Sequence, residues 1–222
     1  MNTNSADYEK PGITVDLVIF TVNKETLNVM LVKRAGPPYQ EYWSLPGGFL
    51  LTGESLDEAA LRVLNEKAGV KDVYLEQLYT FGKPDRDPRD RVITVAYFAL
   101  IPWSNLNQPE SNKVADLKWT SVTQVPKLAF DHREILRYAV QRLRAKVTYS
   151  NIVYGLMPDQ FRLSELQRMY EIILDDQLDK RNFRKRIMAS GLLQETGKKH
   201  LNGAHRPAML YQFKKMEITF MN

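Results

Sequence analysis

The stretch GGFLLTGESLDEAALRVLNEKAGV, residues 47–70, constrains the fold of this chain more than any other segment. Ser55 is a favourable helix N-cap, and Glu58, three residues later, can complete a capping box. Gly69 supplies a left-handed residue of the kind at which helices commonly end. The spacing therefore predicts a helix over residues 56–68. The glycine pair that opens the stretch forms a loop that can bend sharply or let a ligand approach the backbone.

Strand-like runs surround this helix up to about residue 127. The runs ITVDLVIFTV, LNVMLVKR and RVITVAYFAL alternate with turn-forming clusters. This pattern predicts an α+β domain dominated by strands. From Asp131 the pattern changes to that of a helix, which Asp131 and Glu134 can cap. One buried stripe is predicted on this helix: Ile135, Ala139, Leu143 and Val147.

The helical periodicity lapses near TYSNIVYGLMPDQ, where Pro158 interrupts the chain. We place a domain boundary here, with residues 1–150 as the first domain and residues 151–222 as the second. A chain of 222 residues is long enough for one large domain or two smaller ones.

The second domain begins with two predicted helices. Ser164 and Gln167 can form a capping box at the start of the first helix. An apolar stripe with helical spacing follows: Leu166, Met169, Tyr170, Ile173 and Leu174. The turn DDQLD then leads to a second helix, capped by Asp179 and ended near Gly191.

The second of these helices has two unlike faces. Phe183 and Ile187 share the inner side. Arg181, Arg184 and Lys185 share the outer side. Two short helices joined by a tight turn, the second with a basic outer face, fit a helix-turn-helix whose second helix enters the major groove of DNA.

The segment LLQETGKKHLNGAHRPAMLYQFKK follows and predicts two strands around a basic loop, which together form a wing. Met209, Tyr211 and Phe213 alternate as one buried face. Because no third ligand is evident, His200 and His205 are expected to contact solvent or phosphate groups rather than a metal.

Charge divides unevenly along the chain. Residues 181–222 hold nine Lys or Arg against two acids, a net charge of +7, which leaves −2 for the rest of a chain whose total is +5. This asymmetry indicates a basic module that binds a polyanion, with a solvated surface or a protein-interaction module as alternatives. The most apolar run, Ile13 to Val22, is short and contains Asp16, so no membrane span is expected. With no cysteine and no apolar secretion signal, we expect a cytoplasmic protein.

The opening stretch resembles the Nudix box. Its pattern is Gly, five residues, Glu, seven residues, Arg-Glu, an aliphatic, any residue, Glu-Glu, any residue, Gly and an aliphatic. Seven residues are in register with it: Gly48, Glu54, Arg62, Leu64, Glu66, Gly69 and Val70. Val63 stands at the Glu of the Arg-Glu pair, and Lys67 stands at the second Glu of the Glu-Glu pair. The resemblance implies a Nudix-like fold, a mixed-sheet α/β/α sandwich.

The two departures bear on magnesium, because both positions belong to the carboxylate set on which the family's magnesium chemistry depends. Magnesium prefers carboxylate and water oxygens, and Val63 offers none. An ammonium at Lys67, about 5 Å from a divalent ion, would oppose it by roughly 6 kcal/mol at an effective dielectric of about 20. Glu66 remains as a vestigial metal ligand, with Glu54 supporting the loop. We therefore predict no catalytic residues and no required cofactor, with magnesium relevant only if residual hydrolysis persists.

The resemblance also implies a cleft for a nucleoside diphosphate linked to another group. Trp43 and Phe49 flank the glycine loop and are expected to stack on a base or ribose. Arg34, Arg86 and Arg89 are expected to bind phosphate oxygens through their forked guanidinium groups. The last two lie in TFGKPDRDPRDR, an arginine-rich loop before an apolar strand, where binding residues are often placed.

Both halves together resemble the Nudix-related transcriptional regulators, which join a Nudix-like domain to a C-terminal winged helix. The resemblance covers nearly the whole chain and is sharpest at LPGGF, YTFGKPDRDPRDR and LSELQRMYEIILDDQLDKRNFRKRIMASGLL. It implies control of NAD metabolism genes with ADP-ribose or a related nucleotide as effector. Similar members respond to sugars such as arabinose.

We therefore predict a DNA-binding transcriptional regulator, a repressor in preference to an activator. Because one winged helix presents a small reading surface, a homodimer on double-stranded operator DNA is expected. The predicted DNA contacts are Lys180, Arg181, Asn182, Arg184, Lys185, Lys198, Lys199, His200 and Arg206. The alternatives are an active Nudix pyrophosphatase whose C-terminal domain recruits a partner, and a sugar-responsive regulator of the same architecture.

Overall fold

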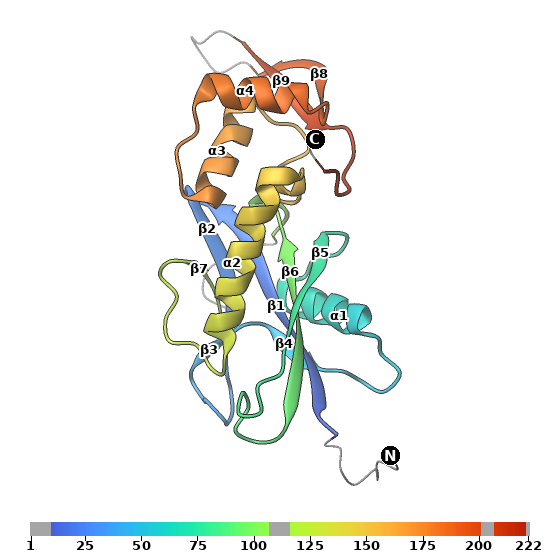
Figure 1. The fold of residues 1–222 in the computed structure, drawn as a ribbon, viewed down its shortest axis with the longest axis vertical. Coiled ribbons are helices and arrows are strands. Elements are labelled where there is room, and N and C mark those ends of the chain that lie inside the picture. The colour runs from blue at the N-terminus through green and yellow to red at the C-terminus, as the bar shows by residue number, and fades with distance from the viewer. Residues whose placement is uncertain (1–9, 107–115, 201–206, 221–222) are drawn as a thin grey trace, which may run out of the picture.

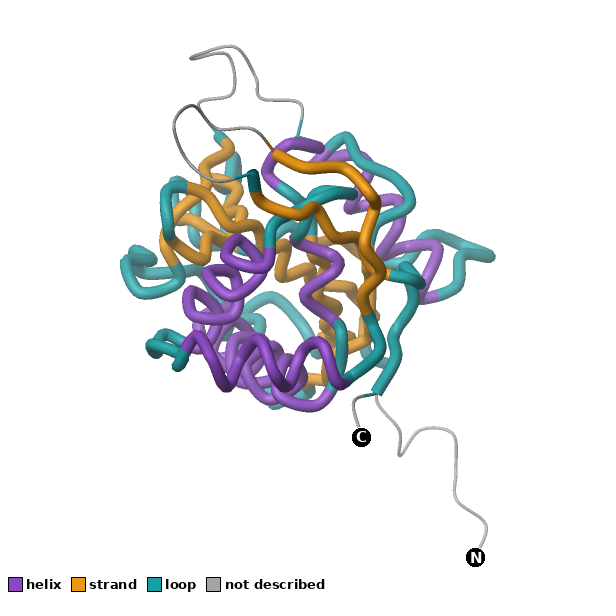
Figure 2. Tube along the Cα trace, turned by 90° about the horizontal axis from the view of Figure 1, so that it is seen from above, coloured by secondary structure: helices purple, strands orange, loops and turns teal. Residues whose placement is uncertain are grey.

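A seven-stranded sheet forms the lower part of the molecule in Figure 1, and a smaller winged module covers its upper end. The computed structural model describes residues 10–106, 116–200 and 207–220. Figure 2 looks from above onto the winged module, with the strands of the sheet behind it. Within these described ranges, no helix has both the length and the apolar character needed to cross a bilayer.

The sheet has the order β3-β2-β1-β6-β5, with β4 paired to β1 and β7 paired to β2. β1 and β6 run parallel, whereas the other pairs are antiparallel, so the sheet is mixed as predicted. The three predicted strand runs coincide with β1, β2 and β6 to within one residue. The strands are β1 (Gly12–Asn23), β2 (Thr26–Lys33), β3 (Trp43–Ser44), β4 (Gly47–Phe49), β5 (Tyr74–Phe81), β6 (Val92–Leu100) and β7 (Leu117–Ser121).

Alternation along β1 builds a core on each face of the sheet, because successive side chains point to opposite sides. Leu17 and Ile19 belong to the hydrophobic cluster of α1 (Leu56–Ala68). Val18 belongs to the cluster of α2 (His132–Tyr149). The predicted α/β/α sandwich is therefore confirmed, with one helix against each face.

Local signals set both ends of α1 as predicted. The Ser55 hydroxyl accepts a hydrogen bond from the Glu58 N–H at 3.3 Å. A Glu58 carboxylate oxygen accepts one from the Ser55 N–H at 2.8 Å. Gly69 ends the helix in the left-handed conformation, with φ of 66°. The capping box and the glycine stop are both confirmed.

The start of α2 differs from the prediction. Asp131 occupies the N-cap position, but its side chain makes no cap hydrogen bond. Its carboxylate instead accepts hydrogen bonds from Arg86, at 2.8 and 3.0 Å. A charge-assisted bidentate pair is stronger than a local cap, which explains the difference. The predicted stripe on α2 is confirmed, because four of its side chains are fully buried: Ile135, Ala139, Leu143 and Val147.

The winged module contains two helices followed by a hairpin. Its elements are η3 (Ile152–Leu156), a 3-10 helix, α3 (Leu163–Leu174), α4 (Lys180–Ala189), β8 (Leu193–His200) and β9 (Ala208–Phe213). Asp179 caps α4, because its carboxylate accepts a hydrogen bond from the Asn182 N–H at 2.8 Å. Gly191, with φ of 67°, follows the end of this helix. On β9, Tyr211 and Phe213 are buried as predicted, whereas Met209 is only partly buried.

The predicted capping box at the start of α3 is wrong in its register. The helix begins at Leu163, so Ser164 already lies within the first turn. Glu165 closes this end, since its carboxylate accepts a hydrogen bond from the Arg162 N–H at 2.7 Å. The Gln167 amide donates to the Leu178 carbonyl at 2.8 Å, which ties α3 to the turn before α4. A tertiary contact therefore takes the side chain that local spacing had assigned to a cap.

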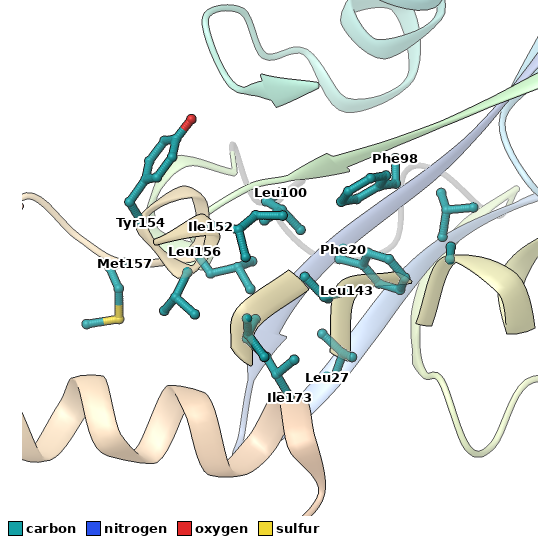
Figure 3. Close-up of a cluster of buried hydrophobic side chains, with 14 of the residues drawn as sticks. Phe20, Leu27, Phe98, Leu100, Leu143, Ile152, Tyr154, Leu156, Met157 and Ile173 are labelled. Atoms are coloured by element: carbon teal, nitrogen blue, oxygen red, sulfur yellow. The ribbon is translucent and has the colours of Figure 1, made fainter. Parts of the chain in front are cut away.

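One hydrophobic cluster crosses from the sheet into the winged module (Figure 3). Phe20 of β1, Leu143 of α2 and Ile173 of α3 all belong to it. Gly155 of η3 packs so closely on the sheet that an added Cβ would stand 2.9 Å from the Leu100 Cβ. The two modules are therefore packed on one another rather than joined by a free linker. The domain division at residue 150 stays a prediction, because the core runs across it.

Candidate effector pocket and DNA-binding face

A cavity of about 310 Å³ opens where β1, β2 and β4 meet the β5–β6 loop and the start of α2. Four of the five residues predicted to bind the effector line it: Arg34, Phe49, Arg86 and Arg89. Five cationic side chains and two carboxylates lie in its wall: Lys33, Arg34, Lys67, Arg86 and Arg89, and Asp16 and Asp87. The cavity therefore favours an anionic ligand.

Arg86 is a buried cation in this wall. Its side chain is 4% exposed, and its Nη2 lies 3.2 Å from Asp16 Oδ2 and 2.8 Å from Asp131 Oδ1. Burial disfavours the charged form, but the hydrogen bond to Asp131 and the charge of Asp16 outweigh it and raise the pKa of Arg86 above its ordinary value. Arg86 is therefore a fixed cation that holds the wall together, with its charge already matched by carboxylates.

His132 lies beside this ion pair and is buried. Its Nδ1 accepts a hydrogen bond from the Leu45 N–H at 2.9 Å, so the neutral ring carries its proton on Nε2. That Nε2 lies 3.6 Å from Asp16 Oδ1. Burial lowers the pKa of His132 in spite of the nearby carboxylates. From the sequence, we considered only the two histidines of the wing and missed this one. Its position at the start of a predicted helix could have indicated that it is buried.

Two arginines and one aromatic ring form the rim of the cavity. The guanidinium carbons of Arg34 and Arg89 lie 4.7 Å and 5.8 Å from the centre of the Phe130 ring. Arg34 Nε donates to the Pro38 carbonyl at 2.7 Å, and burial lowers the pKa of Arg34, with the charge of Arg89 as the next cause. Arg89 pairs with Asp87 at 2.7 Å. No sequence signal singled out Phe130, because its role depends on arginines far away in the chain.

Trp43 does not line the cavity, contrary to the prediction. It is adjacent to Ser44 in β3, and Ser44 lines the cavity in its place. Side chains alternate along a strand, so one of the two must face away. The Trp43 ring instead packs against the core cluster of α2 and lies 4.0 Å from the Lys118 ammonium. Phe49 does line the cavity and is 48% exposed, so it is available for stacking.

The Nudix-box carboxylates do not form a magnesium site. Glu54 bonds to Arg62 at 2.7 Å and accepts from the Leu51 N–H at 2.9 Å, and these bonds lower its pKa to about 2. Glu66 is half exposed and lies 3.6 Å from the same arginine. Val63 is buried in the core at 1% exposure. In the described ranges, no cluster of three His, Cys, Asp or Glu residues is placed to hold a metal ion. The residues present therefore do not fit the magnesium ion that the motif implies.

The outer face of α4 is exposed and basic. Phe183 and Ile187 are buried beneath it, as predicted. Five residues of the predicted DNA-contact set lie exposed on this helix: Lys180, Arg181, Asn182, Arg184 and Lys185. Four of the helix residues line a shallow hollow together with Met188: Arg181, Asn182, Arg184 and Lys185. The arrangement offers hydrogen-bond donors to a groove or a phosphate backbone.

The wing extends beside α4 as the β8–β9 hairpin. Lys198 and Lys199 are exposed on β8. The backbone of His200 ends that strand. His205 and Arg206 lie outside the described residues, so their predicted roles stay predictions.

Two family models match the chain. The NUDIX domain model matches residues 10–139, and the NrtR DNA-binding winged helix domain model matches residues 153–213. The ADPR responsive transcriptional repressor NtrR of Acinetobacter baylyi is 41% identical over 219 residues, which cover 97% of this chain and 87% of that protein. The chain belongs to the NrtR family of Nudix-related transcriptional regulators. The family predicted from the sequence is confirmed.

Solved structures of an NrtR family member share this fold. Shewanella oneidensis NrtR complexed with a 27mer DNA gives a TM-score of 0.83 at 39% identity, covering 91% of this chain and 93% of that chain. The Nudix domain of Shewanella oneidensis NrtR complexed with ADP ribose gives a TM-score of 0.54 at 39% identity, covering 64% of this chain and 94% of that chain. The predicted combination of a Nudix fold and a winged helix is therefore confirmed.

The buried His132 predicts a pH-dependent stability. Because burial lowers its pKa below the ordinary value of 6.5, the unfolded chain binds the proton first as the pH falls. This contribution is complete above about pH 6.5 and is lost below it, by at most about 1.4 kcal/mol per pH unit. Urea unfolding at pH 7.5, 6.5 and 5.5 measures the effect. His132→Gln should flatten the dependence, so a slope equal to that of the wild type would contradict the assignment.

Proposed function

We propose that this chain is a transcriptional repressor of NAD metabolism genes that senses ADP-ribose in the Nudix pocket. It binds operator DNA as a homodimer in the cytoplasm, with α4 as the recognition helix and the β8–β9 hairpin as the wing. The observation that carries the proposal is that one hydrophobic core joins a cationic pocket to an exposed basic helix. The effector pocket and the DNA-binding helix are then parts of a single packed body.

The chemistry of the pocket supports an ADP-ribose-like effector. Arg34 and Arg89 flank Phe130 at the rim, which suits a ligand with both phosphate groups and flat rings. The exposed ring of Phe49 supplies a second apolar surface. The Acinetobacter relative is described as ADPR responsive, and the Shewanella Nudix domain was solved with ADP ribose. A neutral sugar would offer no anionic partner to Arg34 and Lys67, the two cations of this wall that no carboxylate of the described residues pairs.

Helix α2 offers a physical route from the pocket to the winged module. It starts at His132 in the pocket wall and continues for 18 residues, about 27 Å at 1.5 Å per residue. At its far end Arg144 Nε donates to the Ile173 carbonyl of α3 at 3.0 Å. Arg168 of α3 also pairs with Glu25 in the β1–β2 turn. A ligand that binds more tightly to one of two conformations that differ in the position of α2 would favour that conformation. The winged module would then move together with α2.

A DNA-binding titration tests the proposal. Labelled fragments from upstream of NAD metabolism genes in the source genome are titrated with the full chain, and ADP-ribose or arabinose is then added. We expect one fragment to bind at least about 1,000-fold more tightly than random DNA, with two protomers per site. ADP-ribose should weaken this binding at least tenfold, a coupling of about 1.4 kcal/mol, and arabinose should not. Release by the sugar alone, or no preferred fragment, would refute the proposal.

We predict that the chain cleaves ADP-ribose negligibly, even with millimolar magnesium. Val63 is buried in the core and Glu54 is bonded to Arg62, so too few carboxylates remain to activate water around a metal. Product formation is measured by chromatography over several hours. Turnover approaching about 1 per second, within the usual range of enzymes, would establish the pyrophosphatase alternative.

We expect α4 to make the base-specific contacts with DNA and the wing to make phosphate contacts. A good bidentate contact to a base discriminates by about 1 to 3 kcal/mol, so Arg181→Ala or Arg184→Ala should weaken operator binding more than binding to random DNA. Lys199→Ala should weaken both alike and reduce the salt slope by about one unit, as expected for a phosphate contact.

Titrations of operator and random duplexes at several salt concentrations measure both effects. Lys71→Ala, which removes an exposed lysine of the Nudix domain, is the charge-matched control and should change neither. If all three variants of α4 and the wing bound DNA like the wild type, the basic face would be only a solvated surface.

A further inference from the structure

Lys67 places an ammonium group at the effector pocket. It lies in the last turn of α1, four residues after Val63, so both residues occupy the same side of the helix. That side faces the glycine loop, because Val63 Cγ2 lies 3.6 Å from where a Cβ on Gly48 would stand. Lys67 is exposed and lines the cavity together with Gly48 and Phe49. The glycine loop lets a ligand approach this point closely.

The other cations of the pocket are already engaged within the protein. Arg86 pairs with Asp16 and Asp131, and Arg89 pairs with Asp87. Lys33 pairs with Glu41, and Arg34 donates to the Pro38 carbonyl. The Lys67 ammonium, by contrast, makes no ion pair or hydrogen bond with any described residue of the chain. Its charge is therefore available to a bound anion.

The position of Lys67 in the motif gives this charge a specific meaning. In the Nudix box this residue is the second Glu of the Glu-Glu pair, part of the carboxylate set that serves magnesium. The remaining carboxylates of the motif do not fit a magnesium site, since Glu54 and Glu66 both contact Arg62. A lysine at this position brings a positive charge to the place where the motif would use carboxylates to hold one.

We propose that Lys67 binds the diphosphate oxygens of the nucleotide effector and takes the place of magnesium, so that effector binding needs no metal. The proposal rests on the pocket being an effector site for ADP-ribose, as argued above. An ammonium carries three donors on a flexible stem, so it can follow phosphate oxygens as the ligand settles. A carboxylate here would instead repel the diphosphate unless a cation lay between them.

Calorimetric titration of the full chain with ADP-ribose, in EDTA and in 5 mM magnesium, provides the test. The wild-type dissociation constant should be the same in both buffers within about twofold. Lys67→Met should weaken binding about tenfold or more in both, as expected for loss of a charged hydrogen-bond donor. Lys67→Arg should retain most of the affinity. Lys71→Met removes the same charge from an exposed lysine that does not line the cavity, and it should bind like the wild type.

Lys67→Glu gives the sharpest contrast between a lysine and a metal. In EDTA it should bind ADP-ribose more weakly than Lys67→Met, because a carboxylate repels the diphosphate. Magnesium should recover part of that loss in Lys67→Glu and none in Lys67→Met. Thermal unfolding of the unliganded variants should match the wild type, because the side chain is exposed.

The outcomes distinguish this role from the proposed function. If wild-type chain binds ADP-ribose and Lys67→Met binds it equally well, the assignment of Lys67 fails while the effector site stands. If the wild-type chain requires magnesium to bind, the claim of metal-free binding fails in the same way. If the wild-type chain does not bind ADP-ribose in either buffer, the effector assignment fails and the role of Lys67 fails with it.

Discussion

The walls of the pocket depend on the buried pairing of Arg86 with Asp16 and Asp131. These residues come from the β5–β6 loop, from β1 and from the N-cap of α2, so one guanidinium joins three segments that are far apart in sequence. Removing one member of such a pair leaves a buried charge without a partner, which typically costs about 3 to 5 kcal/mol. The pocket walls are thus held in register by charges that are mostly unavailable to a ligand.

The structure distinguishes cationic side chains that form ion pairs within the protein from those that are exposed on its surface. Arg62 supports the glycine loop through Glu54, and Arg86 closes the pocket wall. Lys67, and Arg181 and Arg184 on α4, are exposed and lie in hollows of the surface. Net charge alone does not make this distinction, because it counts a paired arginine and an exposed one equally. The pairing pattern therefore carries more functional meaning than the total charge of the chain.

The shared core gives the two modules a common mechanical frame. Leu143 of α2 and Ile173 of α3 belong to one cluster that also includes the sheet, and Gly155 of η3 packs on Leu100 of that cluster. Close-packed interiors transmit displacement because they contain little free space. Movement of α2 at the pocket would therefore displace α4, because Phe183 and Ile187 of α4 pack in the same core.

The sequence by itself determined several elements whose causes lie within one helical turn. The Ser55–Glu58 box, the Asp179 cap and the alternation along β1 depend on neighbours only a few residues away, and each is present. The family and its two modules were also readable, because the motif residues keep fixed spacings. Tertiary structure alone decided which way Trp43 faces, what Asp131 binds, and that Phe130 joins two arginines. Those outcomes depend on contacts between residues tens of positions apart, and a sequence pattern does not show which distant partner arrives.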